Sequence, residues 1–216
     1  FSSGCRRERE GLVNPDVEAL AHFADCRLPL ATLNPIRFKA PLAPAAAAEQ
    51  AGRSIDWPAL ADGLRQVDAA SDAVLIEGVG GLLVPLDPTA PQCTALSLMQ
   101  AVGYPVLVVG RPGLGTLNHT AMTVRLLREA GLRVAGIVIN QYPTDAAAED
   151  ASVASNRHWL ARLTEAPVLA TVPAVASGQC QPAKGRLGAE VLSAMGLQDW
   201  RRVLAEAEPV GCASRA

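Results

Sequence analysis

Four short apolar runs, separated by segments of helical length, constrain the fold of this chain more than any other feature. The runs cover residues 73–77, 105–109, 134–139 and 167–172. Each has the length and the continuous apolar character of a strand that is buried on both faces. Strands that alternate with helices predict a parallel sheet with helices on both sides, which is the doubly wound α/β class.

Helical periodicity is clearest over residues 117–130. There Leu117, Val124 and Leu127 share one face, and Gly131 is a natural C-terminal stop. Asp16 follows an Asn-Pro pair and is predicted to cap a helix over residues 17–24. The other predicted helices cover residues 45–52, 57–70, 89–102 and 146–163.

Length, charge and cysteine content narrow the class of protein. The chain has 216 residues and a net charge of −2 with no basic block, so a nucleic-acid surface is not expected. No apolar run approaches the ~20 residues of a membrane span. The five cysteines are scattered, which favours reduced thiols in the cytoplasm. We predict a single domain over residues 1–204 and a flexible tail over 205–216.

A lone carboxylate closes the first apolar run in VLIEGVGGLLVPL, residues 74–86. Ligands of open parallel sheets bind beyond the carboxyl ends of the strands. Glu77 can therefore hold Mg²⁺ there, while Gly78, Gly80 and Gly81 let backbone N–H groups approach phosphate oxygens. The alternative is a tight turn in which Glu77 is only solvated.

Two further strand ends carry candidate binding groups. In RPGLGTLNHTAMTV a glycine-rich turn leads into a helix near Thr116 or Leu117, and the N–H groups of that helix start can bind an anion. Ordinary capping by Thr116 is the alternative. Asn140 ends the next strand with amide donors and an acceptor suited to a nucleobase edge, although a polar turn residue would look the same.

In their order along the chain, these segments resemble the dethiobiotin synthetase family. SSGC and GLVNPD match that family's lysine-strand loop and aspartate, and LNPIRFKAPLAP matches its NPY.F..P.SPH segment, with APA in place of SPH. VLIEGVGGLLVPL matches LVEGAGGLLVPL, and the stretch from PVLVVG to GIVIN follows almost without a break. The resemblance spans residues 1 to about 173.

This resemblance implies an α/β fold of the P-loop NTPase type. No GxxxxGK[ST] motif occurs in the sequence. We therefore expect an N-terminally truncated chain, whose first strand, P-loop and catalytic lysine would precede Phe1. No catalytic residue is assigned within the chain itself.

The implied reaction joins CO₂ to 7,8-diaminononanoate with ATP and Mg²⁺ in a cytoplasmic homodimer. One amine becomes a carbamate, the carbamate takes the γ-phosphate, and the second amine closes the ring and expels phosphate. By position, Asp16 and Glu77 are the metal carboxylates, and Asn156 stands where some relatives have a tyrosine that reaches the substrate carboxylate. The other implied site residues are Ser3, Leu117 and Asn118 for the substrate, Gly78, Val79 and Gly80 for phosphate, and Asn140, Gln141, Pro173, Ala174 and Val175 for the adenine.

Two alternatives stay open from the sequence. One is another ATPase of the same branch, such as a MinD-like ATPase or a cobyrinate amidation enzyme. These would normally carry a membrane-targeting helix or a glutaminase domain, respectively, and neither is visible. The other is a catalytically dead binding module, because the P-loop motif is missing.

Overall fold

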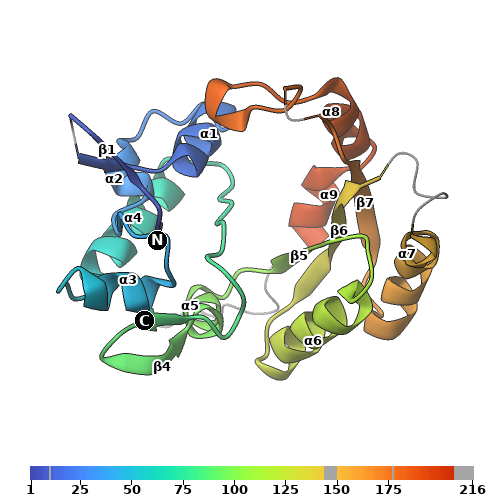
Figure 1. The fold of residues 1–216 in the computed structure, drawn as a ribbon, viewed down its shortest axis with the longest axis horizontal. Helices are drawn as coiled ribbons and strands as arrows, with labels where there is room; N and C mark the ends of the chain where they lie inside the picture. Colours follow the sequence, from blue (N-terminus) through green and yellow to red (C-terminus); the bar gives the residue numbers. More distant parts are fainter. Residues whose placement is uncertain (10, 144–149, 177, 207–216) are drawn as a thin grey trace. The chain divides into compact units, whose positions relative to one another are not determined.

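A computed structural model describes residues 1–9, 11–143, 150–176 and 178–206 (Figure 1). Contacts divide the chain into two units. Unit 1 consists of Phe1–Leu98 and Gln181–Arg186, and unit 2 of Met99–Cys180 and Leu187–Ala216. The single domain expected over residues 1–204 stays a prediction. Helix α9 (Trp200–Glu206) continues past the expected start of the tail at residue 205, and residues 207–216 lie outside the described part.

A parallel sheet organises unit 2. Its strands β5 (Val106–Gly110), β6 (Val134–Tyr142) and β7 (Val168–Pro173) lie in the order β5-β6-β7. Helices α6 (Thr116–Glu129) and α7 (Ala151–Thr164) make the two crossovers between these strands. The expected α/β class with a parallel sheet is therefore confirmed.

Strand alternation gives the sheet two buried faces. On one face Val138 packs with Ala170 and Val172 beneath Val191 of α8 (Ala189–Gly196) and Trp200 of α9. The neighbours of Val138 in β6, Ile137 and Ile139, point to the opposite face and are fully buried. Each such side chain contributes about 1.5–3 kcal/mol through burial. Burial on both faces explains why β6 has no polar alternation over its buried residues, whereas in β5 Val109 is 61% exposed.

Unit 1 is built from short helices and two antiparallel hairpins. Its apolar core gathers Ile36, Phe38, Ala47, Ala48 and Ile55, with Trp57 packed against them. Its elements are β1 (Arg6–Glu8), β2 (Gly11–Val13), α1 (Pro15–Phe23), α2 (Leu30–Leu33), α3 (Pro44–Gln50), α4 (Trp57–Ala69), β3 (Pro85–Asp87), β4 (Ala90–Thr94) and η1 (Pro182–Lys184), and α5 (Ala95–Val102) spans the boundary with unit 2.

The strand predicted over residues 73–77 does not form. This stretch has no regular structure and no strand partner among the described residues, and Leu75 and Ile76 are 77% and 47% exposed. Because a strand exists only through hydrogen bonds to a neighbouring strand, apolar character alone does not establish one.

The helix predicted over residues 89–102 is also wrong in its first part. Residues Ala90–Thr94 form strand β4, and only Ala95–Val102 is helical. The cause is turn chemistry: the Asp87 carboxylate accepts the Thr89 N–H at 2.8 Å and the Thr89 hydroxyl at 2.7 Å, which closes the turn between β3 and β4. The helix predicted over 146–163 begins at Ala151, and residues 146–149 lie outside the described part.

Candidate functional site

Two carboxylates from distant segments of unit 1 lie within electrostatic reach of each other. Asp16 is in the first turn of α1, and Glu77 precedes the glycine-rich loop. Glu77 is exposed as a residue, yet its carboxyl group has lost part of its water shell. This desolvation, followed by the negative charge of Asp16, raises the pKa of Glu77. A pair of acids that repel each other is a suitable site for a divalent cation.

The cap of α1 leaves the Asp16 carboxylate available. The sequence predicted Asp16 as the cap, but α1 begins at Pro15 and its cap is Asn14, whose side-chain oxygen accepts the Asp16 N–H at 2.8 Å. Proline suits the first helical position because it has no N–H to satisfy. Asp16 is exposed. Within the described residues no group of three or more potential metal ligands occurs, but Mg²⁺ is commonly held by one or two carboxylates with water and phosphate.

Ser3 is connected to Asp16 through the same asparagine. Asn14 is 8% exposed, and its amide donates to the Ser3 carbonyl oxygen at 3.4 Å. Asn34, also buried, donates to the Ser2 hydroxyl at 2.6 Å. Sequence reasoning missed the structural role of both asparagines, although each stands before a proline, which would have drawn attention to them.

The glycine-rich loop offers free backbone donors. Gly80 has φ +68°, and a Cβ there would lie 2.9 Å from Val84 Cγ2, so a larger residue would not fit. Across the described part of the chain, no hydrogen bond engages the N–H groups of Gly78, Val79 and Gly80. These three groups are available to an acceptor such as a phosphate oxygen.

Helix α6 begins without a side-chain cap. Its cap residue is Gly115, with φ 90°, so the alternative of capping by Thr116 does not hold. The Thr116 hydroxyl instead contacts the Thr120 hydroxyl at 3.2 Å. The backbone N–H groups of Leu117 and Asn118 have no acceptor among the residues that the structure describes. Asn156 is buried and directed at the turn before α6, whereas Asn118 is exposed.

The residues expected at the nucleobase lie at the ends of β6 and β7. Asn140 and Gln141 belong to β6 itself, which is longer than predicted, and Gln141 has φ 59° while its N–H bonds to Asn140 Oδ1 at 2.9 Å. Tyr142 pairs with Pro173, and its carbonyl oxygen accepts the Ala174 N–H at 2.8 Å. The structure thus brings the segment 140–141 next to the segment 173–175.

The site residues are divided between the units. Ser3, Asp16, Glu77 and the residues Gly78, Val79 and Gly80 belong to unit 1, whereas Leu117, Asn118 and the residues near the ends of β6 and β7 belong to unit 2. That all of them share one rim stays a prediction.

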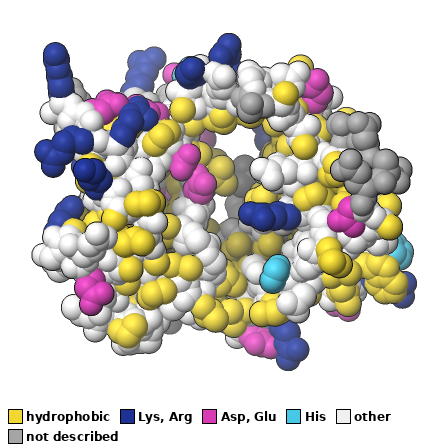
Figure 2. Space-filling model, in the orientation of Figure 1, with side chains coloured by type: hydrophobic (Ala, Val, Ile, Leu, Met, Phe, Trp, Pro, Cys, Tyr) yellow, Lys and Arg dark blue, Asp and Glu magenta, His cyan; other side chains and the backbone are white. Residues whose placement is uncertain are grey.

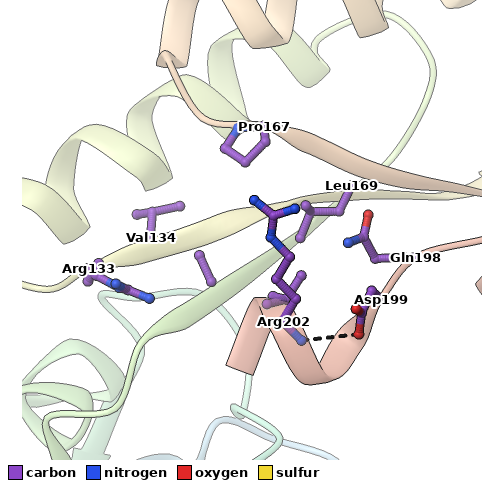
Figure 3. A pocket seen from close by; sticks show the side chains of 9 residues that line it. Arg133, Val134, Pro167, Leu169, Gln198, Asp199 and Arg202 are labelled. Carbon is purple, nitrogen blue, oxygen red and sulfur yellow. Dashed lines mark hydrogen bonds between the residues drawn. The ribbon is translucent and has the colours of Figure 1, made fainter. Parts of the chain in front are cut away.

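A pocket of about 510 Å³ lies at the opposite, amino ends of β6 and β7 (Figure 3). Arg133 and Val134 line it where β6 begins, and Pro167 lines it just before β7. Asp199 Oδ1 accepts the backbone N–H of Arg202 at 3.1 Å on its α9 side. None of the predicted site residues lines this pocket.

Charges are mixed over the face of the molecule drawn in Figure 2, where basic side chains stand at several separate places with acidic ones among them. This distribution agrees with the sequence, which has no basic block. Among the helices that the structure describes, none combines the length and apolar character needed to cross a membrane.

Comparison with known proteins identifies the family. A family model described as an AAA domain matches residues 7–179. The ATP-dependent dethiobiotin synthetase BioD of Anaeromyxobacter sp. (strain K) is 47% identical over 158 residues, which cover 73% of this chain and 68% of that protein. The enzyme of the same name from Ralstonia nicotianae is 41% identical over 160 residues, which cover 74% of this chain and 67% of that protein. The one from Yersinia pestis bv. Antiqua is 36% identical over 172 residues, which cover 80% of this chain and 69% of that protein. The chain therefore belongs to the ATP-dependent dethiobiotin synthetase family of ligases, with an α/β fold of the P-loop NTPase type.

Proposed function

We propose that this chain carries the metal, nucleotide and substrate contacts of an ATP- and Mg²⁺-dependent ring closure that converts 7,8-diaminononanoate and CO₂ to dethiobiotin. Membership of the family supports the reaction class and the use of ATP. The observation that carries the metal part is that the negative charge of Asp16, after desolvation, raises the pKa of Glu77.

Asp16 and Glu77 would hold Mg²⁺ between them, directly or through water. Their mutual repulsion fits this role, because a divalent cation relieves it. When bound, Mg²⁺ supplies charge neutralisation for the transferring phosphoryl group. The chain's own contribution is to position the carboxylates, and at Asp16 the Asn14 cap fixes the backbone by accepting its N–H at 2.8 Å.

For the nucleotide we propose phosphate contacts in unit 1 and adenine contacts in unit 2. The free N–H groups of Gly78, Val79 and Gly80 suit phosphate oxygens. Asn140 still has its amide donors for the adenine edge, while its oxygen accepts the Gln141 N–H. Pro173, Ala174 and Val175, at and after the end of β7, would cover the base.

The carboxylate of 7,8-diaminononanoate would bind at the start of α6. The free N–H groups of Leu117 and Asn118 stand at the positive end of a helix of 14 residues. The amines of the substrate must lie near the γ-phosphate, and the alkyl arm keeps the carboxylate away from the metal. Ser3 would contact the substrate at its amine end.

The proposal includes a homodimer in the cytoplasm. It also holds that the 216 residues alone do not close the ring, because their sequence contains no GxxxxGK[ST] motif and the P-loop makes most phosphate contacts in such enzymes. Dethiobiotin formed by the purified chain from 7,8-diaminononanoate, bicarbonate and ATP would contradict this point.

A chimera tests the function itself. The N-terminal segment of the Anaeromyxobacter enzyme would be joined before Phe1, and dethiobiotin would be measured by mass spectrometry. We expect ATP-dependent product that requires Mg²⁺. Glu77→Gln should lower kcat more than it raises the Kd of ATP, since the metal acts on the transferring phosphate. Asn118→Ala should raise the Michaelis constant for the diamine substrate, with little effect on the Michaelis constant for ATP.

The matched control is Glu49→Gln, which removes an exposed carboxylate at the end of α3. It should leave kcat unchanged. A folded chimera that makes no dethiobiotin under any of these conditions would refute the proposed reaction, and equal kcat in Glu77→Gln and its parent would refute the metal assignment.

A further inference from the structure

A buried side chain of α7, Asn156, forms hydrogen bonds with the turn between β5 and α6. Asn156 is 3% exposed, and its Nδ2 donates to the carbonyl oxygens of Pro112 at 2.7 Å and Gly113 at 3.2 Å. The amide also lies 3.5 Å from the Ser152 hydroxyl, and its two shorter contacts reach two successive peptide groups of this turn.

The cap residue of α7 contacts the second of these peptide groups through its N–H. Asp150 accepts the Ser152 N–H at 2.9 Å and the Ser152 hydroxyl at 2.6 Å. Its carboxylate also accepts the backbone N–H of Leu114. Gly113 lies so close that a Cβ there would be 3.2 Å from Asp150 Oδ2. Asp150, the cap of α7, and Asn156, in its second turn, therefore contact two consecutive peptide groups of this turn.

The fixed turn leads directly into the first residue of α6. The Gly113 carbonyl that receives Asn156 also accepts the N–H of Thr116 at 3.2 Å. Between them stands Gly115, whose φ of 90° is not held by any side-chain cap. The direction of the first α6 amides thus depends on where α7 holds the Gly113 carbonyl.

We propose that Asn156 and Asp150 are positioning residues that aim the N–H groups of Leu117 and Asn118 at the substrate carboxylate. This role rests on the proposed binding of that carboxylate at the start of α6. Neither residue touches the substrate. They act through the turn, and so they set how strongly the site prefers an acid over the same diamine without its carboxylate.

The test uses the ¹⁵N-labelled 216-residue chain, titrated with 7,8-diaminononanoate and separately with 2,3-diaminooctane, the same diamine without its carboxylate. In the wild type, the amide signals of Leu117 and Asn118 should respond to the acid only. Asn156→Asp keeps the shape but places an acceptor against two carbonyl oxygens. It should weaken binding of the acid about tenfold, the effect of losing about one hydrogen bond to a charged group, and leave binding of the diamine unchanged.

Two controls separate positioning from loss of stability. Ser155→Ala changes an exposed neighbour of Asn156 and should bind the acid as the wild type does. Leu160→Ala removes a fully buried side chain of α7 that lies outside the turn contacts. It should lower the melting temperature but keep the preference for the acid. If Asn156→Asp does not fold, Asp150→Ala takes its place with the same expectation.

The outcomes are distinct. Acid binding in Asn156→Asp equal to that of the wild type, or an equal loss in Leu160→Ala, would overturn the positioning role while the carboxylate site stands. A wild type whose Leu117 and Asn118 amides do not respond to the acid would overturn the carboxylate site and this role with it. Loss of the acid preference only in the Asn156 and Asp150 variants supports the proposal.

Discussion

Desolvation of its carboxyl group, followed by the charge of Asp16, raises the pKa of Glu77, although Asp16 belongs to α1 and Glu77 to the segment before the glycine loop. Both effects favour the protonated form of Glu77. Without a cation, the ionised pair is therefore a source of instability that the fold tolerates. Tolerated repulsion between acids is typical of metal and active sites.

Glu77→Gln should raise the melting temperature of the chain at about pH 7. The folded-state pKa of Glu77 lies above the unfolded one, so the stability that this group contributes is present below the unfolded pKa of about 4.3 and is lost as the pH rises through the folded value. Glu77→Gln has no carboxyl group to ionise and therefore does not lose this stability. The difference in melting temperature between the variant and the wild type should shrink as the pH falls, and Mg²⁺ should stabilise the wild type more than the variant.

Thermal melts at several pH values, with and without Mg²⁺, measure this difference. Glu49→Gln removes an exposed acid elsewhere in unit 1 and should show neither effect. A Glu77→Gln variant that melts below the wild type at neutral pH, or that gains as much from Mg²⁺, would count against the pair.

Gly63→Ala should destabilise unit 1, although alanine is the better helix former. A Cβ at Gly63 in α4 would lie 2.6 Å from the backbone oxygen of Thr32 in α2. The two helices must then separate, at about 1–3 kcal/mol. Gly196→Ala at the end of α8 is the control, because a Cβ there meets nothing within 4 Å. Urea denaturation should show Gly63→Ala as the less stable of the two, and the reverse order would show that the α2–α4 contact is loose.

Strands buried on both faces were predictable from sequence, whereas partners distant in sequence were not. The runs that became β5, β6 and β7 carry enough continuous apolar character to be placed within a few residues. Residues 73–77 have the same character but no neighbouring strand in the described part of the chain. Pairing is a property of two segments, and one segment's composition does not contain it.

For the site too, single residues were predictable from sequence, whereas contacts between distant segments were not. Asp16 and Glu77 could be named from their positions, but the cap of α1 was misassigned because the proline at the first helical position was not used as a marker. The contacts of Asn156 with Pro112 and Gly113 join residues more than forty positions apart. No local pattern could have revealed them.

The stability of the turn between β5 and α6 should depend on pH through Asp150. Hydrogen bonds from the Ser152 hydroxyl and N–H, and from the Leu114 N–H, lower the pKa of Asp150. Its contribution is therefore present above the unfolded pKa of about 3.9 and is lost as the pH falls through the folded value. Asp150→Asn should melt below the wild type at neutral pH, and the difference should close in acid.

The amide proton of Leu114 reports the same event directly. Its chemical shift in the wild type should titrate with the Asp150 carboxyl group, and in Asp150→Asn it should not. Asp72→Asn, an exposed acid in unit 1, is the control and should leave the Leu114 titration in place. A Leu114 signal that is insensitive to acid in the wild type would show that the carboxylate does not hold this turn.

Asn14 performs two tasks that substitutions can separate. Its oxygen caps α1 at the Asp16 N–H, and its amide holds the Ser3 carbonyl. Asn14→Ala should lower the free energy of unfolding by about 0.5–2 kcal/mol through loss of the cap. Asn14→Ser keeps a capping oxygen and should recover most of that stability, but its short hydroxyl cannot also reach Ser3.

Metal binding separates the two tasks. If metal binding requires that Asn14 join Asp16 to Ser3, both variants should bind Mn²⁺ more weakly than the wild type. Mn²⁺ serves here as a probe for Mg²⁺ and is measured by electron paramagnetic resonance. Wild-type Mn²⁺ affinity in Asn14→Ser would show that the cap alone positions Asp16, and equal stability of the two variants would show that the cap contributes nothing.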